Sequence, residues 1–498
     1  MHPMSSGSPI AVLATHTVQG ANSNTAKLAS TFKIGPFDHL LPPSAVIAVV
    51  FVWRRPLDSK AATSDPIISF NLLQMALSRL LDFYPHLTGR VHINDEDGSP
   101  EINQLGAGVE LSEALCETAL PSEATEFSRG GFPDHGNLLL PQRNGSHNDF
   151  SQQPILSIQH TRFGCGSVSL GVCISHTVCD AHGFVQLMED LSEIYRGFRR
   201  SGHTDISPKS VQLDQIPCIT SHLSDVSLSS QEVQKALSIE PADYQIEKIP
   251  AVMSFTSDKH VTGKVLYFGP AELKALKHAA SPSLQGHWIS TFEAISAHLW
   301  LSVQRARSHY QSLKNTAFDN RETADLLTSL DWRESTRLNL PPRYFPNAVS
   351  EPFITLPLKD LSHEALPETA SMIHEVLRAR TPKDQNETLS WVMAQPKKDH
   401  INLRCRFNER SFIISQWSKL NMYAVHFETD NKGYSILPER VWPPFTETSL
   451  VDGLAYFLPT GRDLSDDTDG LGIEIALSLH EPIWDILEQD VCFRKFRR

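Results

Sequence analysis

Residues 167–195 read SVSLGVCISHTVCDAHGFVQLMEDLSEIY, and this stretch decides the fold. Its first nine residues alternate between bulky and small side chains, which predicts a β-strand over 167–175 with one bulky and one small face. From Phe184 to Tyr195 the apolar residues recur every three or four positions. That spacing predicts an amphipathic helix directly after the strand.

The junction between this strand and this helix carries the best candidates for chemistry. Strand ends of α/β sheets are where functional sites tend to form. His176 could present one ring nitrogen to a cleft there, and an imidazole with a pKa near ~6.5 can take a proton from an alcohol at neutral pH. Asp180, one turn later, could orient the imidazole or turn away and anchor the loop through a cation. Gly183 would let the chain turn tightly into the helix.

Other interpretations of these residues need no catalysis. The H-x-x-x-D pattern also occurs by chance, so alone it is weak evidence for a base. His182 could join His176 in binding a metal, but two histidines without a cysteine pair are a poor zinc pattern, and we predict no metal. Cys173 and Cys179 flank the candidate base, and we expect both to be small buried hydrophobic residues.

Strand-like and helix-like segments alternate along the rest of the chain, which predicts an α/β protein. Residues 44–53 are typical of a buried strand, and residues 69–84 of a helix that Pro85 ends. Residues 290–307 predict a second long helix, opened by a Ser290-x-x-Glu293 capping box and turning Phe292, Ile295, Leu299 and Val303 inward. Residues 380–400 look like a polar surface excursion.

The chain divides most naturally into two halves. The stretch from about 200 to 260 is rich in polar residues and weak in periodicity. We therefore predict an N-terminal domain over 1–205, a crossover linker over 206–262 and a C-terminal domain over 263–498. A length of 498 residues agrees with two or three domains.

Composition excludes several classes of function. The formal net charge of -13 argues against a nucleic-acid partner, although local cations could still bind an anionic cofactor. The longest apolar run, residues 44–53, is too short to span a bilayer, and we find no secretory signal. Seven cysteines without a C-x-x-C pair suit a reducing compartment. We therefore expect a cytoplasmic protein with no membrane partner.

Several segments in a fixed order resemble the BAHD acyltransferases, the coenzyme A-dependent family of plants and fungi. The segments that carry the resemblance are LLDFYPHLTGRV (80–91), Asn103 with 106–109, 159–183, 266–280, 290–300, 331–333, 343–349 and 414–417. Together they cover nearly the whole chain, and their order is more specific than any one of them.

The resemblance implies a role for each matching residue. His176 falls on the family's general base, and Asp180 on an aspartate that pairs with an arginine at the position of Arg333. Ser415 falls on a hydroxyl that can stabilise the oxyanion, and Trp417 lines the same channel. The further channel positions are Ser290, Thr291 and His182. For Ser290 and Thr291, helix capping alone is an equal alternative.

The resemblance also implies a fold and a reaction. The fold is a pair of chloramphenicol-acetyltransferase-like α/β domains, with mixed sheets and helices and an active-site channel at their interface. The reaction is direct transfer of an acetyl group from acetyl-coenzyme A, a co-substrate, to a hydroxyl of an alkaloid or terpenoid secondary metabolite. We expect a monomer with no tightly bound cofactor.

One departure from the family pattern keeps alternatives open. Where the family has D-F-G-W-G, this chain has His426-Phe427-Glu428-Thr429-Asp430, which places it nearer divergent fungal members. A condensation-type enzyme would share the H-x-x-x-D motif but take its acyl group from a carrier protein. A paralogue that binds a metabolite without catalysis is the other alternative, and the altered block is its best support.

Overall fold

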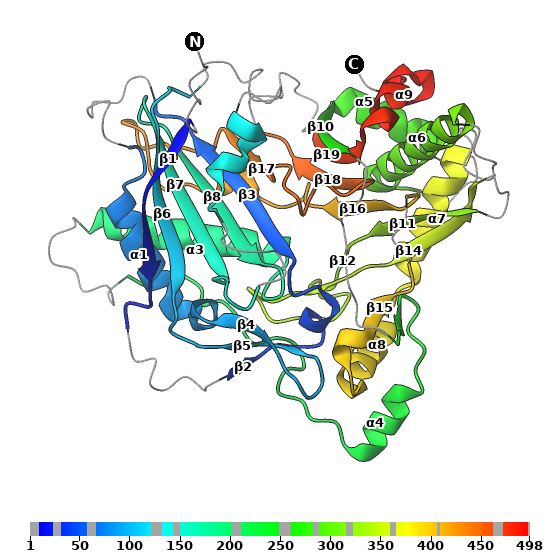
Figure 1. Cartoon of the computed structure of the whole chain (residues 1–498), viewed down its shortest axis with the longest axis horizontal. Helices are drawn as coiled ribbons and strands as arrows, with labels where there is room; N and C mark the ends of the chain where they lie inside the picture. Colours follow the sequence, from blue (N-terminus) through cyan, green and yellow to red (C-terminus); the bar gives the residue numbers. More distant parts are fainter. Residues whose placement is uncertain are drawn as a thin grey trace, which may run out of the picture.

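Two six-stranded mixed β-sheets, each covered by helices, form the frame of the protein in a computed structural model (Figure 1). The structure describes residues 9–22, 31–56, 66–120, 132–142, 150–201, 211–248, 260–281, 288–314, 322–358, 365–405, 409–461 and 472–496. The α/β class expected from the alternating segments is confirmed.

The first sheet has the strand order β1-β6-β7-β8-β3-β17. Its strands are β1 (Ile10–Val18), β6 (Val109–Cys116), β7 (Leu156–Phe163), β8 (Val168–Ser175), β3 (Val46–Trp53) and β17 (Arg440–Trp442). All neighbours are antiparallel except β6 and β7. Strand β17 comes from far along the chain and pairs Val441 with Phe51 at the edge of the sheet. The predicted strands over 44–53 and 167–175 are confirmed.

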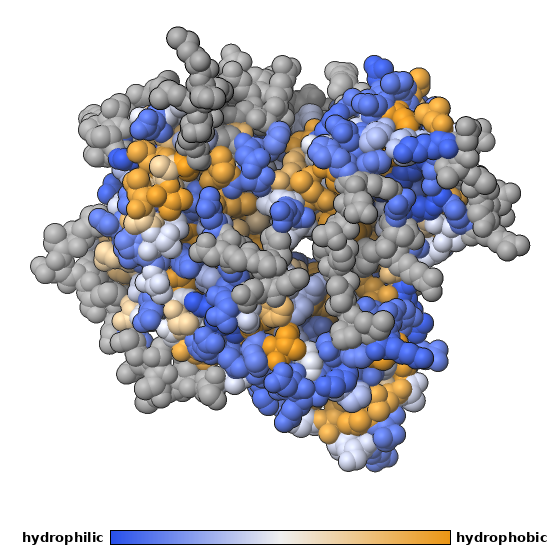
Figure 2. Space-filling view, viewed as in Figure 1, coloured by the Kyte–Doolittle hydropathy of each residue, from blue (hydrophilic) through white to orange (hydrophobic). Residues whose placement is uncertain are grey.

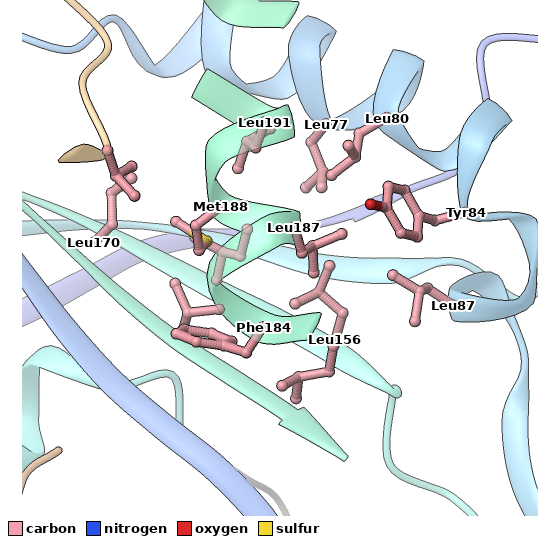
Figure 3. Close-up of a cluster of buried hydrophobic side chains, with 14 of the residues drawn as sticks. Leu77, Leu80, Tyr84, Leu87, Leu156, Leu170, Phe184, Leu187, Met188 and Leu191 are labelled. Carbon is pink, nitrogen blue, oxygen red and sulfur yellow. The ribbon is translucent and has the colours of Figure 1, made fainter. Parts of the chain in front are cut away.

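Helices α1 (Phe70–Phe83) and α3 (Ala181–Arg200) pack on one face of this sheet, and the short helix η3 (Pro85–Thr88) follows α1. Figure 3 shows Leu77, Leu80 and Tyr84 facing Leu187 and Leu191 in one cluster of apolar side chains. These residues are all buried, as the helical spacing predicts.

The small face of β8 has a steric reason. The 3-10 helix η4 (Pro133–Leu139) approaches this face so closely that a Cβ atom on Gly171 would lie 1.9 Å from the carbonyl oxygen of Leu139. Cys173 is also buried on this strand, and Cys179 is buried just beyond it. The prediction that both cysteines are buried is confirmed.

The second sheet has the strand order β10-β19-β18-β16-β11-β14. Its strands are β10 (Val261–Phe268), β19 (Ile473–His480), β18 (Leu454–Pro459), β16 (Phe412–Gln416), β11 (Thr323–Thr328) and β14 (Phe353–Pro357). The helices of this half are α5 (Pro270–Ala280), α6 (Thr291–Leu313), α7 (Leu366–Ala379), α9 (Glu481–Gln489) and α10 (Val491–Arg494).

Helix α6 begins at the predicted capping box, in which Ser290 and Glu293 satisfy each other's backbone donors. Of the four side chains expected to turn inward, Ile295, Leu299 and Val303 are fully buried. Phe292 also turns inward, since it packs against the same core and meets Phe457 edge to face, but its ring is only partly buried because it lines a cavity as well.

Shorter elements complete the description. They are β2 (Thr31–Lys33), β4 (Arg90–Ile93), β5 (Pro100–Asn103), β12 (Leu330–Asp331), β13 (Val349–Ser350), η2 (Asp38–Leu40), η8 (Lys398–His400) and η9 (Met422–Ala424). In the crossover, α4 (Ser230–Leu237) contacts α8 (Pro382–Ala394), and β9 (Tyr244–Ile246) pairs with β15 (Ile401–Leu403).

The prediction of a polar surface excursion over 380–400 is wrong. Thr381 and Asp384 form a capping box that opens α8, and the helix then buries Leu389 and Val392. The polar residues that suggested a surface excursion lie mainly in its first two turns. The predicted boundaries at 205 and 262 stay predictions. Within the described residues, no helix is both long and apolar enough to cross a membrane.

Candidate active site

A cavity of about 1080 Å³ lies between the two sheets and takes its walls from both halves of the chain. Figure 2 shows a hollow near the centre of the molecule, between the two halves. The cavity brings together predicted site residues that are far apart in the sequence: His176, Asp180, His182, Ser290, Arg333, Ser415 and Trp417. Within the part of the chain that the structure describes, no group of His, Cys, Asp and Glu is arranged to hold a metal ion.

His176 stands at the wall of this cavity, one residue after β8 ends. Its backbone N–H donates to the carbonyl of Ala45 at 2.8 Å, and this bond fixes the loop to the segment just before β3. Burial lowers the pKa of the imidazole, while its own carbonyl, Asp180 and Asn347 act in the opposite direction. The ring is therefore neutral at pH 7, the state in which an imidazole can accept a proton.

The carboxylate of Asp180 binds backbone N–H groups and an arginine around the site. As the N-cap of α3, its Oδ1 accepts from the backbone N–H groups of His182 and Gly183 at 3.0 and 3.2 Å. Its Oδ2 accepts from Ala348 at 2.9 Å, and Arg333 reaches both oxygens at 2.9 Å. Burial raises the pKa of Asp180, but Arg333 and these donors outweigh it and hold the pKa below its ordinary value.

Arg333 also binds the segment that follows it in the sequence. Its Nη2 donates to the carbonyl of Pro346 at 2.7 Å, and its Nε to the carbonyl of Tyr344 at 3.2 Å. Next to these contacts, a Cβ atom on Gly183 would lie 2.1 Å from the carbonyl oxygen of Phe345. Gly183 lies inside helix α3, so close backbone packing, rather than the predicted tight turn, explains the glycine.

Ser415 and Trp417 reach the cavity from the second sheet. Ser415 lies near the end of β16, which is paired in parallel with both β11 and β18. The indole of Trp417 is buried and meets Tyr456 edge to face, with ring centroids 5.3 Å apart. Its backbone N–H donates to Phe457 at 2.8 Å. Ser415 pairs with Tyr456 of β18 and lines the cavity from the half opposite the one that carries His176.

The remaining predicted positions differ in what they contact. Ser290 both caps α6 and lines the cavity, whereas Thr291, the first residue of α6, is not among the lining residues. His182 is half exposed on the cavity wall, with Nδ1 4.0 Å from a carboxylate oxygen of Asp331. Burial, followed by the charge of Arg333, lowers the pKa of His182.

The altered block over 426–430 joins the two halves. Phe427 is buried and meets Trp53 and Tyr195 edge to face, with centroids 5.3 Å apart in each pair. The next residue, Glu428, accepts a hydrogen bond from the hydroxyl of Tyr195 at 2.9 Å and pairs with Arg199 at 3.2 Å. These contacts tie the loop after Trp417 to the first half. The altered block therefore connects the two halves through buried and charged contacts.

Sequence reasoning missed two residues behind the site. Asn347 was noted only as part of a matching segment, yet its amide contacts the backbone of His176. Asp38 is not among the predicted site residues, because a single aspartate in an apolar stretch forms no local sequence pattern. The structure places its buried carboxylate against Asn347.

Comparison with known proteins gives matches over most of the chain. A profile of the Transferase family matches residues 9–480. The chain is 25% identical over 456 residues to taxadien-5-alpha-ol O-acetyltransferase of Taxus chinensis, which covers 91% of this chain and 90% of that protein. It is 26% identical over 423 residues to anthranilate N-benzoyltransferase protein 1 of Dianthus caryophyllus, with 78% and 82% covered.

Solved structures share the fold at lower sequence identity. TRI101 of F. graminearum, in complex with coenzyme A and deoxynivalenol, has a TM-score of 0.67 and 19% identity, and the match covers 94% of this chain and 99% of that one. Vinorine synthase has a TM-score of 0.64 and 16% identity, with 98% of each chain covered. The predicted two-domain fold is confirmed by these matches.

Proposed function

Because the chain belongs to the Transferase family, that of the BAHD acyltransferases, and is a coenzyme A-dependent acyltransferase, we propose that it moves an acetyl group from acetyl-coenzyme A to a hydroxyl of a small secondary metabolite. The observation that carries the proposal is the cavity between the sheets, with His176 on one wall and Ser415 on another.

In the proposed mechanism His176 is the general base. Its Nε2 removes the proton of the acceptor hydroxyl while the oxygen attacks the thioester carbonyl, and the imidazolium returns the proton to the leaving thiolate. The lowered pKa of His176 supports this role, because the ring must be neutral before the reaction. General-base assistance of this kind is worth about 10²–10⁴ in rate.

Ser415 is proposed to donate a hydrogen bond to the oxyanion that forms during attack. A donor of this kind helps only if it is already in place, since its advantage is the absence of reorganisation in the transition state. The position of Ser415 on a strand paired on both sides supports such a role. Transfer is direct, and the chain has no G-x-S-x-G nucleophile elbow.

Asp180 and Arg333 are proposed to hold the loop that aims His176, rather than to exchange protons. The carboxylate already makes five contacts with four residues. Two come from Arg333, and one each from the backbone N–H groups of His182, Gly183 and Ala348. Trp417, Ser290 and His182 are proposed to line the channel for substrate and coenzyme, because all three lie on its wall. Thr291 is proposed to act in the helix start alone.

Coenzyme A is preferred over a carrier-bound donor in this proposal. The cavity wall includes Arg378 and Lys419, for which no carboxylate partner is found within the described residues, so the acidic chain still offers local cations to a phosphorylated donor. TRI101 binds coenzyme A on the same fold. The proposed acceptors are terpenoid or alkaloid alcohols. The solved structure of TRI101 contains deoxynivalenol, and the Taxus relative is named as an O-acetyltransferase of taxadien-5-alpha-ol.

The test combines one variant with one product assay. Purified protein is incubated with acetyl-coenzyme A or malonyl-coenzyme A and a panel of terpenoid and alkaloid alcohols, without any carrier protein, and products are detected by mass. We expect acetylated product from the wild type and none above background from His176→Ala, with an unchanged circular dichroism spectrum. Near wild-type turnover by His176→Ala would overturn the assignment of the base.

A metabolite-binding protein without catalytic activity is the second candidate, favoured only by the altered block over 426–430. The same assay separates the two. Saturable binding of acetyl-coenzyme A or an alcohol with no acetylated product from any pair in the panel would favour binding alone. We further propose a cytoplasmic monomer with domains over 1–205 and 263–498.

A further inference from the structure

Asp38 is a buried acid that the proposed mechanism does not use. It lies at the start of η2 and is fully buried, with no ion-pair partner within the described residues. Its carboxylate accepts from the backbone N–H of Gly35 at 2.9 Å and from the backbone and side chain of Asn347 at 3.2 and 2.8 Å. Burying a carboxylate without a cation is costly. Its presence there calls for a role.

The role follows from how the amide of Asn347 is used. A side-chain amide offers two hydrogens on nitrogen and lone pairs on oxygen. Both hydrogens of Nδ2 are engaged, one with Asp38 at 2.8 Å and the other with the carbonyl of His176 at 2.9 Å. A flipped amide would point its oxygen at the carboxylate and the carbonyl, so Asp38 and the carbonyl of His176 together fix which way Asn347 faces, with Asp38 as the charged acceptor.

Asn347 and His176 each keep one buried polar atom that is not engaged in this arrangement. The Oδ1 of Asn347 is buried without a hydrogen-bond partner, and so is the Nδ1 of His176. Against the effect of burial, the pKa of the imidazole is raised first by its own backbone and by Asp180, and then by the side chain of Asn347 and the backbone of Cys179. An oxygen with free lone pairs and a ring nitrogen that can carry hydrogen are complementary groups.

We propose that Asp38 is a positioning residue, which through the amide of Asn347 keeps the hydrogen of the neutral His176 ring on Nδ1 and leaves the lone pair on Nε2. The tautomer of a histidine is set by the bond that its other nitrogen makes. A ring with its hydrogen on Nε2 could not accept a proton from the acceptor hydroxyl at that atom. The inference rests on the proposed role of His176 as the base.

The kinetic test uses Asp38→Asn, with Asp325→Asn as the matched control. Asp325 is also a buried aspartate, held by Thr355 in the second sheet, and does not line the cavity. Asp38→Asn should lower kcat by about 10²-fold, within the range of general-base catalysis, because the new amide can present NH2 to Asn347 and release its orientation. KM for acetyl-coenzyme A and for the alcohol should stay within about twofold.

The direct readout is the ¹⁵N NMR spectrum of protein labelled in histidine, with the His176 ring identified by the signals missing from His176→Gln. In the wild type we expect a protonated Nδ1 and an unprotonated Nε2. In Asp38→Asn and in Asn347→Leu we expect the other tautomer or a mixture. This measurement on the wild type needs no variant of Asp38 to fold.

Each result decides between the two proposals. A wild-type ring with its hydrogen on Nε2, or a kcat for Asp38→Asn equal to that of Asp325→Asn, would overturn the role of Asp38. If His176→Ala is inactive while Asp38→Asn keeps wild-type kcat, only this inference fails. If His176→Ala is as active as the wild type, the base itself is wrongly assigned.

Discussion

Arg333 reaches both carboxylate oxygens of Asp180 at 2.9 Å, although 153 residues separate the two in the sequence. Both side chains are nearly inaccessible to solvent, and the pair joins the loop after β8 to the segment over 343–349 of the other half. This contact is the basis for the proposal that the pair holds the loop that aims His176.

Asp180→Asn should destabilise the protein as well as lower its activity. The substitution leaves the buried guanidinium of Arg333 with only the half-exposed carboxylate of Asp331 as a charge partner, at 3.2 Å. Breaking a buried pair by removing one partner costs about 3–5 kcal/mol, and Asp331 should reduce this loss. Thermal unfolding followed by circular dichroism measures the loss. As a control, Glu488→Gln breaks the exposed pair with Lys264 and should cost less than about 1 kcal/mol. Equal losses for both variants would argue against the anchoring role.

As pH falls, the enzyme should keep its activity to a lower pH than a histidine base with an ordinary pKa would allow. Burial lowers the folded-state pKa of His176 below 6.5, so the ring stays neutral, and competent as a base, as pH falls past that value. The acid limb of kcat/KM should therefore have an apparent pKa below about 6.5. A limb centred at or above neutrality would show that another group, or a charged His176, controls the reaction.

Ser415→Ala should lower kcat by about 10²-fold or more and leave KM for acetyl-coenzyme A nearly unchanged, since an oxyanion donor acts in the transition state. Steady-state kinetics with one fixed alcohol separates the two constants. Ser371→Ala, on α7 and bonded to the carbonyl of Pro367, is a matched control and should keep wild-type kcat. A raised KM with intact kcat would instead mean that Ser415 binds substrate.

Gly183→Ala should clearly lower the stability of the protein and its turnover, whereas Gly197→Ala on the same helix should lower them less. The methyl group at 183 would meet the backbone of Phe345 at 2.1 Å, which cannot move without shifting the segment that holds Arg333. At 197 it would meet a side-chain methyl group of Val211 at 2.6 Å rather than backbone, and Val211 does not line the cavity. We expect a loss of about 1–3 kcal/mol for the first variant. Melting temperatures and turnover of the two proteins test the contrast.

The elements nearest the site could be predicted because their signals are local. Strand β8 and helix α3 each repeat their own period, and the capping box of Ser290 is visible within four residues. Helix α8 could not be predicted from the sequence, because its buried residues gather in its last turns and give little periodicity. The contact of Asp38 with Asn347 spans 309 residues, and no local pattern marks such a pair.

Strand β17 has a consequence for how this enzyme can be divided. Its residues Arg440–Trp442 come from the later half of the sequence but complete the edge of the earlier sheet against β3. A protease cut in the crossover should therefore nick the chain without releasing two fragments. Each half expressed alone should be insoluble, with an open sheet edge at β3 in one case. Co-expression of the two halves should restore a soluble, active complex.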